Sequence, residues 1–201
     1  MSVLDDQDAK VRKNAVISMQ YSNESDRSGA INSLKKALND SELMVRKAAI
    51  SSLEHLAVYE KSPQAITALG MALEDQDPQN RCAAIWALAR IKDDQVCNLI
   101  CLALKDRDQT VRYKAVQALG RLQTPCCEDS LVAALRDRDG SLRACAAEAL
   151  GKRKSQKALK PLIERLNDPE IHVRINTIGA LKNIDDTQAV GPLIDLLRKN
   201  R

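Results

Sequence analysis

The sequence predicts an all-α fold, a solenoid of about six helical hairpins with about twelve helices. Composition gives the first reason: 29% of the 201 residues are charged and 44% are hydrophobic, a balance typical of helical proteins. Aromatic content gives the second, because the chain has one Trp, three Tyr and no Phe, so its core must pack with aliphatic side chains. Seven Gly and six Pro are too few for a turn-rich β-sandwich.

A repeated motif gives the third reason. Each copy has a Leu, an Asp two residues later, and an Arg six residues after that Asp. The motifs start at Leu4, Leu38, Leu73, Leu104, Leu135 and Leu166, and their arginines are Arg12, Arg46, Arg81, Arg112, Arg143 and Arg174. A period of 31 to 35 residues is the signature of a repeat architecture. We therefore expect residues 1–201 to form a single stack of repeats.

Each repeat is expected to contain two antiparallel helices. Apolar residues stand three, four and seven positions after each Arg, as in Ala115, Val116 and Leu119, which is one face of a helix. A second apolar cluster precedes each later Leu, for example residues 158–163. Asp77–Pro78 and Asp168–Pro169 have the pattern of an N-cap followed by a first-turn proline, so helices should start there within a residue or two.

Other positions predict how the helices end and how the turns are held. Gly120 and Gly151 are expected to close their helices. Arg153 is a departure, because it stands where other repeats have an apolar residue such as Leu122. The recurrent Asp and Arg predict a structural ladder and not an active site, since a catalytic residue is used once. Each Asp can cap the following helix, and each Arg can reach a neighbouring repeat's Asp.

The residues resemble a known family. An Asp followed five and six positions later by an aliphatic residue and Arg, in a hairpin of about 31 residues, resembles the HEAT repeat. The short variant found in phycobilisome-lyase-type proteins is the most similar form, as residues 104–108, 111–112 and 118–120 illustrate. The resemblance implies a right-handed α–α superhelix in which the Arg-bearing helix is the second of each pair and lines the concave side.

The sequence lacks the motifs of several common enzyme classes and any membrane-spanning run. No metalloprotease, hydrolase-elbow, Walker or dinucleotide motif is present, and the two histidines, His55 and His172, form no His-Glu pair. We expect no enzyme activity, no cofactor and no metal. Six cysteines at unpatterned spacings indicate reduced thiols in the cytoplasm, with the nucleus as the alternative. No apolar run is long enough to span a membrane.

Helical geometry predicts which side chains face the concave surface. At 100° per residue, positions −2, +1, +5 and +9 from each Arg point away from the apolar face. From these rows we select a candidate partner-binding set that contains Trp86, Tyr113 and a basic stripe of Arg90, Arg121 and Lys152. The full set is Lys13, Met44, Lys47, Cys82, Trp86, Arg90, Tyr113, Gln117, Arg121, Glu148 and Lys152.

Aromatic side chains beside arginine are typical of interaction hot spots. The leading interpretation is a non-enzymatic scaffold that binds another protein, through an acidic and apolar peptide or helix in the concave groove. One alternative is a partner subunit of a bilin lyase or isomerase. Another is nucleic-acid binding through residues 152–154, Lys157 and Lys160, which the missing aromatic interleaving disfavours. The terminal helix, which is mostly apolar from Leu193 to Leu197 and has no polar cap, also leaves self-association open.

Overall fold

The computed structural model describes residues 3–91, 94–122 and 127–199, and within these ranges the chain is helical and contains no strand. The chain divides into two compact units, residues 1–96 (unit 1) and 97–201 (unit 2). Each unit is a stack of helical hairpins, as the sequence predicts, and the all-α HEAT-like class is confirmed.

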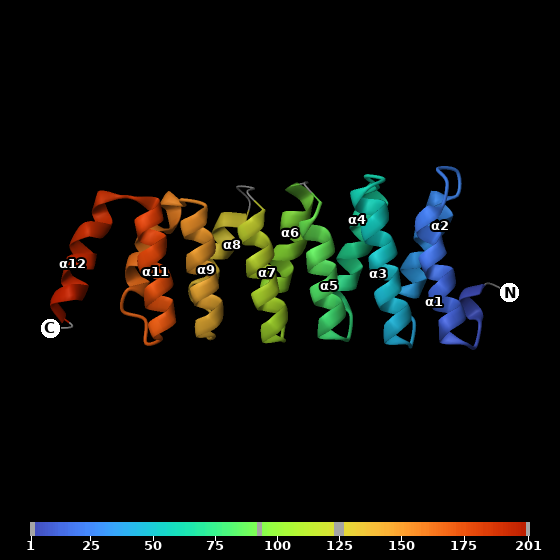
Figure 1. Cartoon of the computed structure of the whole chain (residues 1–201), viewed down its shortest axis with the longest axis horizontal. Helices are drawn as coiled ribbons and strands as arrows, with labels where there is room; N and C mark the ends of the chain where they lie inside the picture. The colour runs from blue at the N-terminus through green and yellow to red at the C-terminus, as the bar shows by residue number, and fades with distance from the viewer. Residues whose placement is uncertain (1–2, 92–93, 123–126, 200–201) are drawn as a thin grey trace. The chain divides into compact units, whose positions relative to one another are not determined.

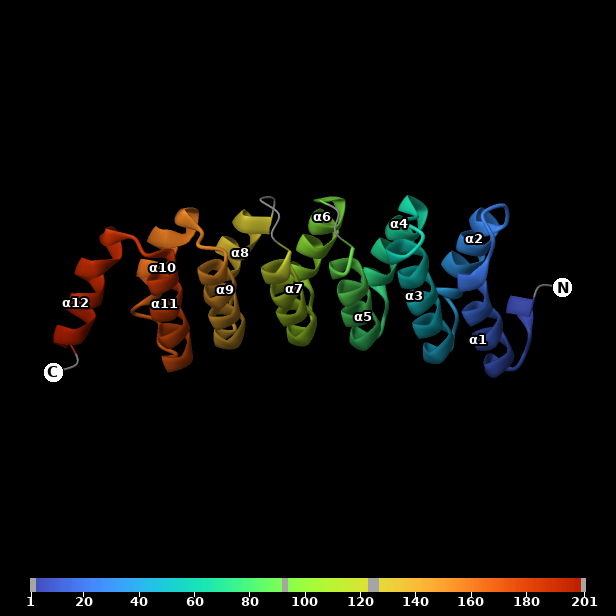
Figure 2. The same ribbon diagram turned by 45° about the horizontal axis from the view of Figure 1, so that its top comes forward.

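Unit 1 contains two layers of helices. Its helices are α1 (Ala9–Ser18), α2 (Arg27–Ala37), α3 (Leu43–Val58), α4 (Pro63–Met71) and α5 (Pro78–Ala89), preceded by the short 3-10 helix η1 (Val3–Asp5). The Arg-bearing helices α1, α3 and α5 stand side by side as one layer, and α2 and α4 form the other (Figures 1 and 2). The interior is aliphatic, as the ring-poor composition requires; Leu34, Leu53 and Leu69 are fully buried there.

Unit 2 repeats this arrangement. Its helices are α7 (Gln109–Arg121), α8 (Glu128–Ala134), α9 (Gly140–Lys152), α10 (Leu159–Arg165), α11 (Ile171–Ile184) and α12 (Val190–Lys199), and α6 (Asp94–Leu102) begins just before the boundary between the units. The Arg-bearing helices α7, α9 and α11 form one layer, and α8 and α10 belong to the other (Figure 2). None of the described helices is long and apolar enough to cross a membrane.

The motif Asp does not itself cap the following helix. The acid two residues later does so where it is an Asp: Asp77 accepts a hydrogen bond from the Gln79 N–H, at the start of α5, and Pro78 is the first helical residue as predicted. Glu42 and Glu170 stand at the same N-cap position without a side-chain capping hydrogen bond. The motif Asp instead accepts the N–H of that capping residue, as Asp75 does from Asp77. At Asp168–Pro169 the helix starts two residues later, within the predicted margin: Glu170 is the N-cap and α11 begins at Ile171.

The predicted ladder of Asp and Arg is confirmed. Each paired Arg donates from Nε to the motif Asp of the next repeat, and from its terminal nitrogen to the backbone carbonyl of its own motif Asp, so one guanidinium ties two interhelical turns together. The Nε–carboxylate distances are 2.8 Å for Arg12–Asp40, 2.9 Å for Arg46–Asp75, 3.3 Å for Arg112–Asp137 and 2.8 Å for Arg143–Asp168. The ladder is a packing device present in both units, consistent with a structural role.

The ladder predicts acid sensitivity. The hydrogen bond from Arg12 lowers the pKa of Asp40. In Asp75 and Asp168 burial is the largest single influence and would raise the pKa, but the hydrogen bonds from Arg46 or Arg143 and from a backbone N–H, together with the nearby positive charge, outweigh it and lower the pKa. A carboxyl whose folded pKa lies below its unfolded value of about 3.9 stabilises the fold fully above that value, and this contribution is lost as the pH falls through the folded pKa.

We therefore expect the free energy of unfolding to fall steadily below about pH 5. Urea unfolding followed by circular dichroism from about pH 7 to about pH 2 measures this. Asp168→Asn lowers stability at neutral pH and should flatten the acid limb of the curve. An acid limb equally steep in Asp168→Asn and in the wild type would show that this carboxyl does not contribute.

Two glycines have a role different from the one predicted. Gly120 and Gly151 do not end their helices, because α7 continues to Arg121 and α9 to Lys152. A Cβ on Gly151 would lie 2.4 Å from the Ala180 Cα, and a Cβ on Gly120 would lie 2.8 Å from the Ala149 Cβ. These glycines let α9 approach α11, and α7 approach α9, at distances that no side chain permits.

The remaining departures concern Arg153 and the cysteines. Arg153 extends to the C-terminal end of α7 and donates to the carbonyls of Leu119 and Leu122, which satisfies groups that a helix end leaves unpaired.

Cys97 and Cys127 form a disulfide with their Cα atoms 6.1 Å apart. The expectation that all the cysteines are reduced is wrong for this pair. Stacking brings residues 30 positions apart together, which spacing alone did not reveal; Cys126 lies outside the described residues.

Candidate functional site

Unit 2 contains a groove between α7 and α9, which we call the α7–α9 groove. A cavity of about 130 Å³ at one end is lined by Gln117, Gly120, Arg121, Cys145, Glu148, Ala149 and Lys152. A second cavity of about 340 Å³ is lined by Gln109, Thr110, Tyr113, Asp139, Ser141 and Leu142. Five of the residues predicted from the helical rows therefore line the two cavities: Tyr113, Gln117, Arg121, Glu148 and Lys152.

Tyr113 is the aromatic residue of the α7–α9 groove. Its ring is half-buried, and its hydroxyl accepts a hydrogen bond of 3.3 Å from Nε2 of Gln117, one turn further along α7. Burial raises the pKa of Tyr113, and the nearby Cys145 and Glu148 raise it further. The hydroxyl is therefore neutral at physiological pH, and the ring presents an apolar face with a polar tip, the combination that favours binding sites.

The thiol of Cys145 faces Tyr113 across the groove. Burial raises the pKa of Cys145 to about 11, with a further contribution from Glu148. A thiol with this pKa is protonated at neutral pH and is a poor nucleophile. The environment of Cys145 therefore does not activate it for catalysis or for attaching a cofactor.

The rim of the groove carries charged side chains from both helices. Lys152 forms an ion pair of 2.6 Å with Glu148, one turn away on α9. Arg121 is exposed near the C-terminal end of α7. Exposed pairs of this kind contribute at most about 1 kcal/mol, so an acidic group of a partner can replace Glu148 beside Lys152 at small cost.

The predicted residues of unit 1 are more scattered. Lys13, Cys82 and Trp86 are half-buried, whereas Met44, Lys47 and Arg90 are exposed. Trp86 belongs to unit 1 and Tyr113 to unit 2, so the interpretation that both rings belong to one binding surface stays a prediction.

Arg90 is part of a cluster that the sequence revealed only in part. Its guanidinium pairs with Glu54 and donates a hydrogen bond of 3.3 Å to the Tyr59 hydroxyl. The His55 ring lies between two tyrosines, with centroids 4.9 Å from Tyr59 and 6.0 Å from Tyr21. Tyr21 and His55 share the +9 row with Arg90, but Tyr59 lies outside every row, so periodicity could not place it.

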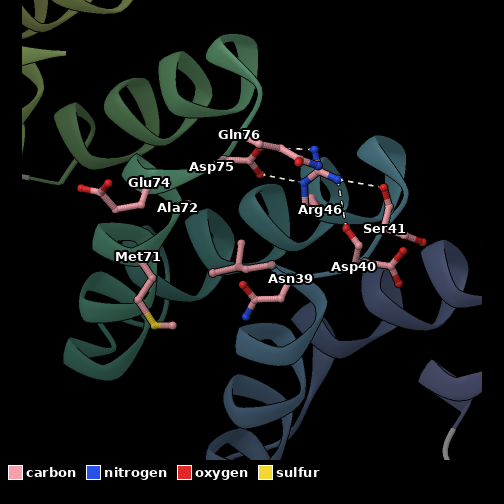
Figure 3. Close-up of a pocket in the computed structure, with 10 residues that line it drawn as sticks. Asn39, Asp40, Ser41, Arg46, Met71, Ala72, Glu74, Asp75 and Gln76 are labelled. Atoms are coloured by element: carbon pink, nitrogen blue, oxygen red, sulfur yellow. Dashed lines mark hydrogen bonds and ion pairs between the residues drawn. The ribbon is translucent and has the colours of Figure 1, made fainter. Parts of the chain in front are cut away.

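A third cavity, of about 650 Å³, lies in unit 1 between two neighbouring interhelical turns (Figure 3). Figure 3 shows the Arg46 guanidinium against Asp75 and the backbone of Asp40 and Ser41, with Met71 apart from them. Of its charged side chains, Arg46, Asp40 and Asp75 are already engaged in the ladder and Glu74 is not, so the ladder accounts for most of the charge in this pocket.

Metal-binding chemistry finds no support in the part of the chain that the structure describes. Among those residues, no three His, Cys, Asp or Glu side chains are grouped so as to hold a metal ion.

Comparison with known proteins places the chain among helical repeat proteins. A family model described as HEAT repeats matches residues 1–76, 66–126 and 128–201. No curated protein sequence matches the chain.

Several solved structures share the fold. The YibA protein of E. coli superposes with a TM-score of 0.67 at 23% identity, over 98% of this chain and 73% of that one. A designed armadillo repeat protein in complex with the peptide (KR)4 gives 0.56 at 20%, over 91% and 97%. The CpcE–CpcF complex of phycocyanin lyase from Nostoc sp. gives 0.56 at 22%, over 76% and 98%. At these identities the likeness shows the fold alone.

Proposed function

We propose that this chain, which belongs to the HEAT-repeat family, is a non-enzymatic scaffold that binds a peptide or helix of another protein in the α7–α9 groove. The observation that carries the proposal is the pair of cavities in that groove, one lined by Tyr113 and the other by charged side chains. An apolar anchor beside a small number of polar groups is the usual composition of a binding site.

The chemistry of the groove specifies the kind of partner. Tyr113 offers an apolar ring for one side chain of the partner, and Arg121 and Lys152 favour Asp or Glu beside it. Because Gly120 holds α7 against α9, the groove exists before the partner arrives. A preformed groove loses little conformational entropy on binding.

The absence of enzyme activity is part of the proposal. The thiol in the groove, Cys145, has its pKa raised by burial to about 11, and the recurring Asp and Arg residues that pair are engaged in the ladder. A designed armadillo protein of the same fold was solved with a bound peptide, which supports peptide binding as a use of this architecture.

Two alternatives remain testable. A role as a partner subunit of a bilin lyase rests on the fold shared with the CpcE–CpcF complex, and a change of visible absorbance on adding a bilin would favour it. Nucleic-acid binding through residues 152–160 has little support, since Lys152 pairs with Glu148, Lys157 with Asp129, and Arg153 with carbonyls of α7. A salt-dependent mobility shift with DNA or RNA would favour it.

The test is a selection of peptides from a random display library on the wild-type protein, followed by fluorescence anisotropy with the selected peptides. Tyr113→Ala should weaken binding by about 2 kcal/mol, or roughly thirtyfold in Kd, the scale of an interface hot spot. Tyr113→Phe keeps the ring and should bind nearly as the wild type does. Arg121→Glu should weaken binding more at low salt than at high salt, because exposed charges are screened.

Lys160→Glu is the matched control for Arg121→Glu, since Lys160 is also exposed but lies on α10 in the other layer. It should leave the affinity unchanged. Selected peptides that bind equally well to Tyr113→Ala, or a selection that enriches no peptide, would contradict the proposed groove.

A further inference from the structure

The last Arg-bearing helix, α11, exposes a position that is buried in the earlier repeats. Four residues after the motif Arg stand Val16 and Ile50 in unit 1 and Val116 and Ala147 in unit 2, all at most 2% exposed. The equivalent residue of α11, Ile178, is 39% exposed, and Ile175 and Ile171 on the same helix are also exposed. We call these three isoleucines, with Val190 and Ile194 of α12, the C-terminal face.

The first Arg-bearing helix, α1, shows the converse. One residue before the motif Arg stand Val45 in unit 1 and Leu142 and Val173 in unit 2, all buried. The equivalent residue of α1, Val11, is 40% exposed. Ser18 is exposed too. Its counterpart in α3, Ser52, is buried and donates a hydrogen bond to the Val16 carbonyl of the preceding Arg-bearing helix. We call Val11, Ser18 and Asp6 the N-terminal face.

The ladder ends with opposite charges on these two faces. Arg174 donates to the carbonyls of Asp168 and Pro169, at 2.8 and 3.0 Å, but among the described residues it forms no ion pair with a carboxylate. Asp6 accepts the N–H of Asp8 at 2.8 Å, as every motif Asp accepts its capping residue's N–H. Arg12 donates to the backbone carbonyl of Asp6, but no described Arg forms an ion pair with the Asp6 carboxylate. Arg174 is therefore positioned to donate to one more motif Asp, and Asp6 to accept from one more motif Arg.

The helices at the two ends complement each other as well. In Figure 1, α12 lies beside α11, and it corresponds to the first helix of a hairpin; no described Arg-bearing helix follows it. The helix α1 is an Arg-bearing helix preceded, among the described residues, only by the three residues of η1.

We propose that copies of this chain associate head to tail, with the C-terminal face of one copy packed on the N-terminal face of the next. The aliphatic side chains Ile178 and Val11 become buried, and Arg174 of one copy pairs with Asp6 of the other, which extends the ladder across the joint. A contact between two different faces leaves a free end on each side, so assembly continues beyond the dimer. The α7–α9 groove takes no part in this contact.

Sedimentation velocity of the full chain, from about 1 µM to about 1 mM, tests the proposal through mass action. The wild type should increase in mass with concentration and pass beyond the dimer. Val11→Asp and Ile178→Asp should each remain monomeric with unchanged helix content by circular dichroism. Leu102→Asp, at an exposed leucine outside both faces, should assemble as the wild type does. An equimolar mixture of Val11→Asp and Ile178→Asp should form a 1:1 dimer and stop there, since one competent face of each kind remains.

Charge exchange gives a second readout that does not alter the apolar surface. Asp6→Arg and Arg174→Asp should each assemble at least about tenfold more weakly than the wild type, and their mixture should recover the assembly. A wild type that stays monomeric throughout overturns the proposal. The proposal is also overturned if the wild type forms only dimers and Val11→Asp forms them equally well, because that result identifies a symmetric contact between two C-terminal faces.

Discussion

Replacing Arg143 with Ala is expected to lower the free energy of unfolding by about 3–5 kcal/mol, the cost of breaking a buried ion pair by removing one partner. Asp168 is 3% exposed and accepts two hydrogen bonds from Arg143, at 2.8 and 2.7 Å. Without the guanidinium, this carboxylate keeps the Glu170 N–H and the longer contact of 3.4 Å to Arg165. Urea unfolding at pH 7, followed by circular dichroism, measures the loss.

A matched arginine separates this effect from the loss of a side chain in general. Arg136 is 73% exposed and lies 3.8 Å from Glu164, so Arg136→Ala should cost at most about 1 kcal/mol. The double variant Arg143→Met, Asp168→Leu removes both charges and should recover much of the stability, because an apolar pair of similar volume avoids a buried unpaired charge. Equal losses in Arg143→Ala and Arg136→Ala would show that the ladder does not stabilise the stack.

Replacing Gly151 with Ala is expected to destabilise the fold by about 1–3 kcal/mol, although alanine is the better helix former. The added Cβ would lie 2.4 Å from the Cα and 2.7 Å from the Cβ of Ala180. Backbone cannot move aside as a flexible side chain can, so α9 and α11 would have to separate. Thermal and urea unfolding of the full chain measure the effect.

Gly179 provides the control on the adjacent helix. A Cβ there meets nothing within 4 Å, so Gly179→Ala should stabilise the fold by up to about 1 kcal/mol through helix propensity and a smaller loss of backbone entropy. The two Gly→Ala changes should therefore have opposite signs. The same sign in both would mean that the approach of α9 to α11 is not limited by the missing side chain.

Periodicity was sufficient to predict the repeats, the helical hairpins and the ladder. Those features depend on residue spacing, and the spacing of the Leu, Asp and Arg positions is preserved in all six motifs. The groove residues on α7 and α9 were also predicted, because helical angles decide which positions lie away from the core. Tyr113, Gln117 and Arg121 follow from that geometry.

The errors concern contacts between helices whose distance the spacing does not fix. Gly151 has a sequence context typical of a helix end, and only the approach of Ala180 reveals its packing role. The Cys97–Cys127 disulfide likewise depends on how α6 stacks against the start of α8. Tyr59 joins the cluster with His55 and Arg90 from a position outside the helical rows. In each case the missing information was a distance between elements.

The most direct test of the scaffold function is to locate a selected peptide on the protein. Backbone amide shifts of the isotopically labelled chain, recorded during titration with the unlabelled peptide, report the binding surface residue by residue. We predict that the largest changes occur at Tyr113, Gln117, Arg121, Glu148 and Lys152, on the facing sides of α7 and α9. Changes concentrated instead at Tyr21, Tyr59 and Arg90 in unit 1, or on α8 and α10, would contradict the α7–α9 groove as the binding site.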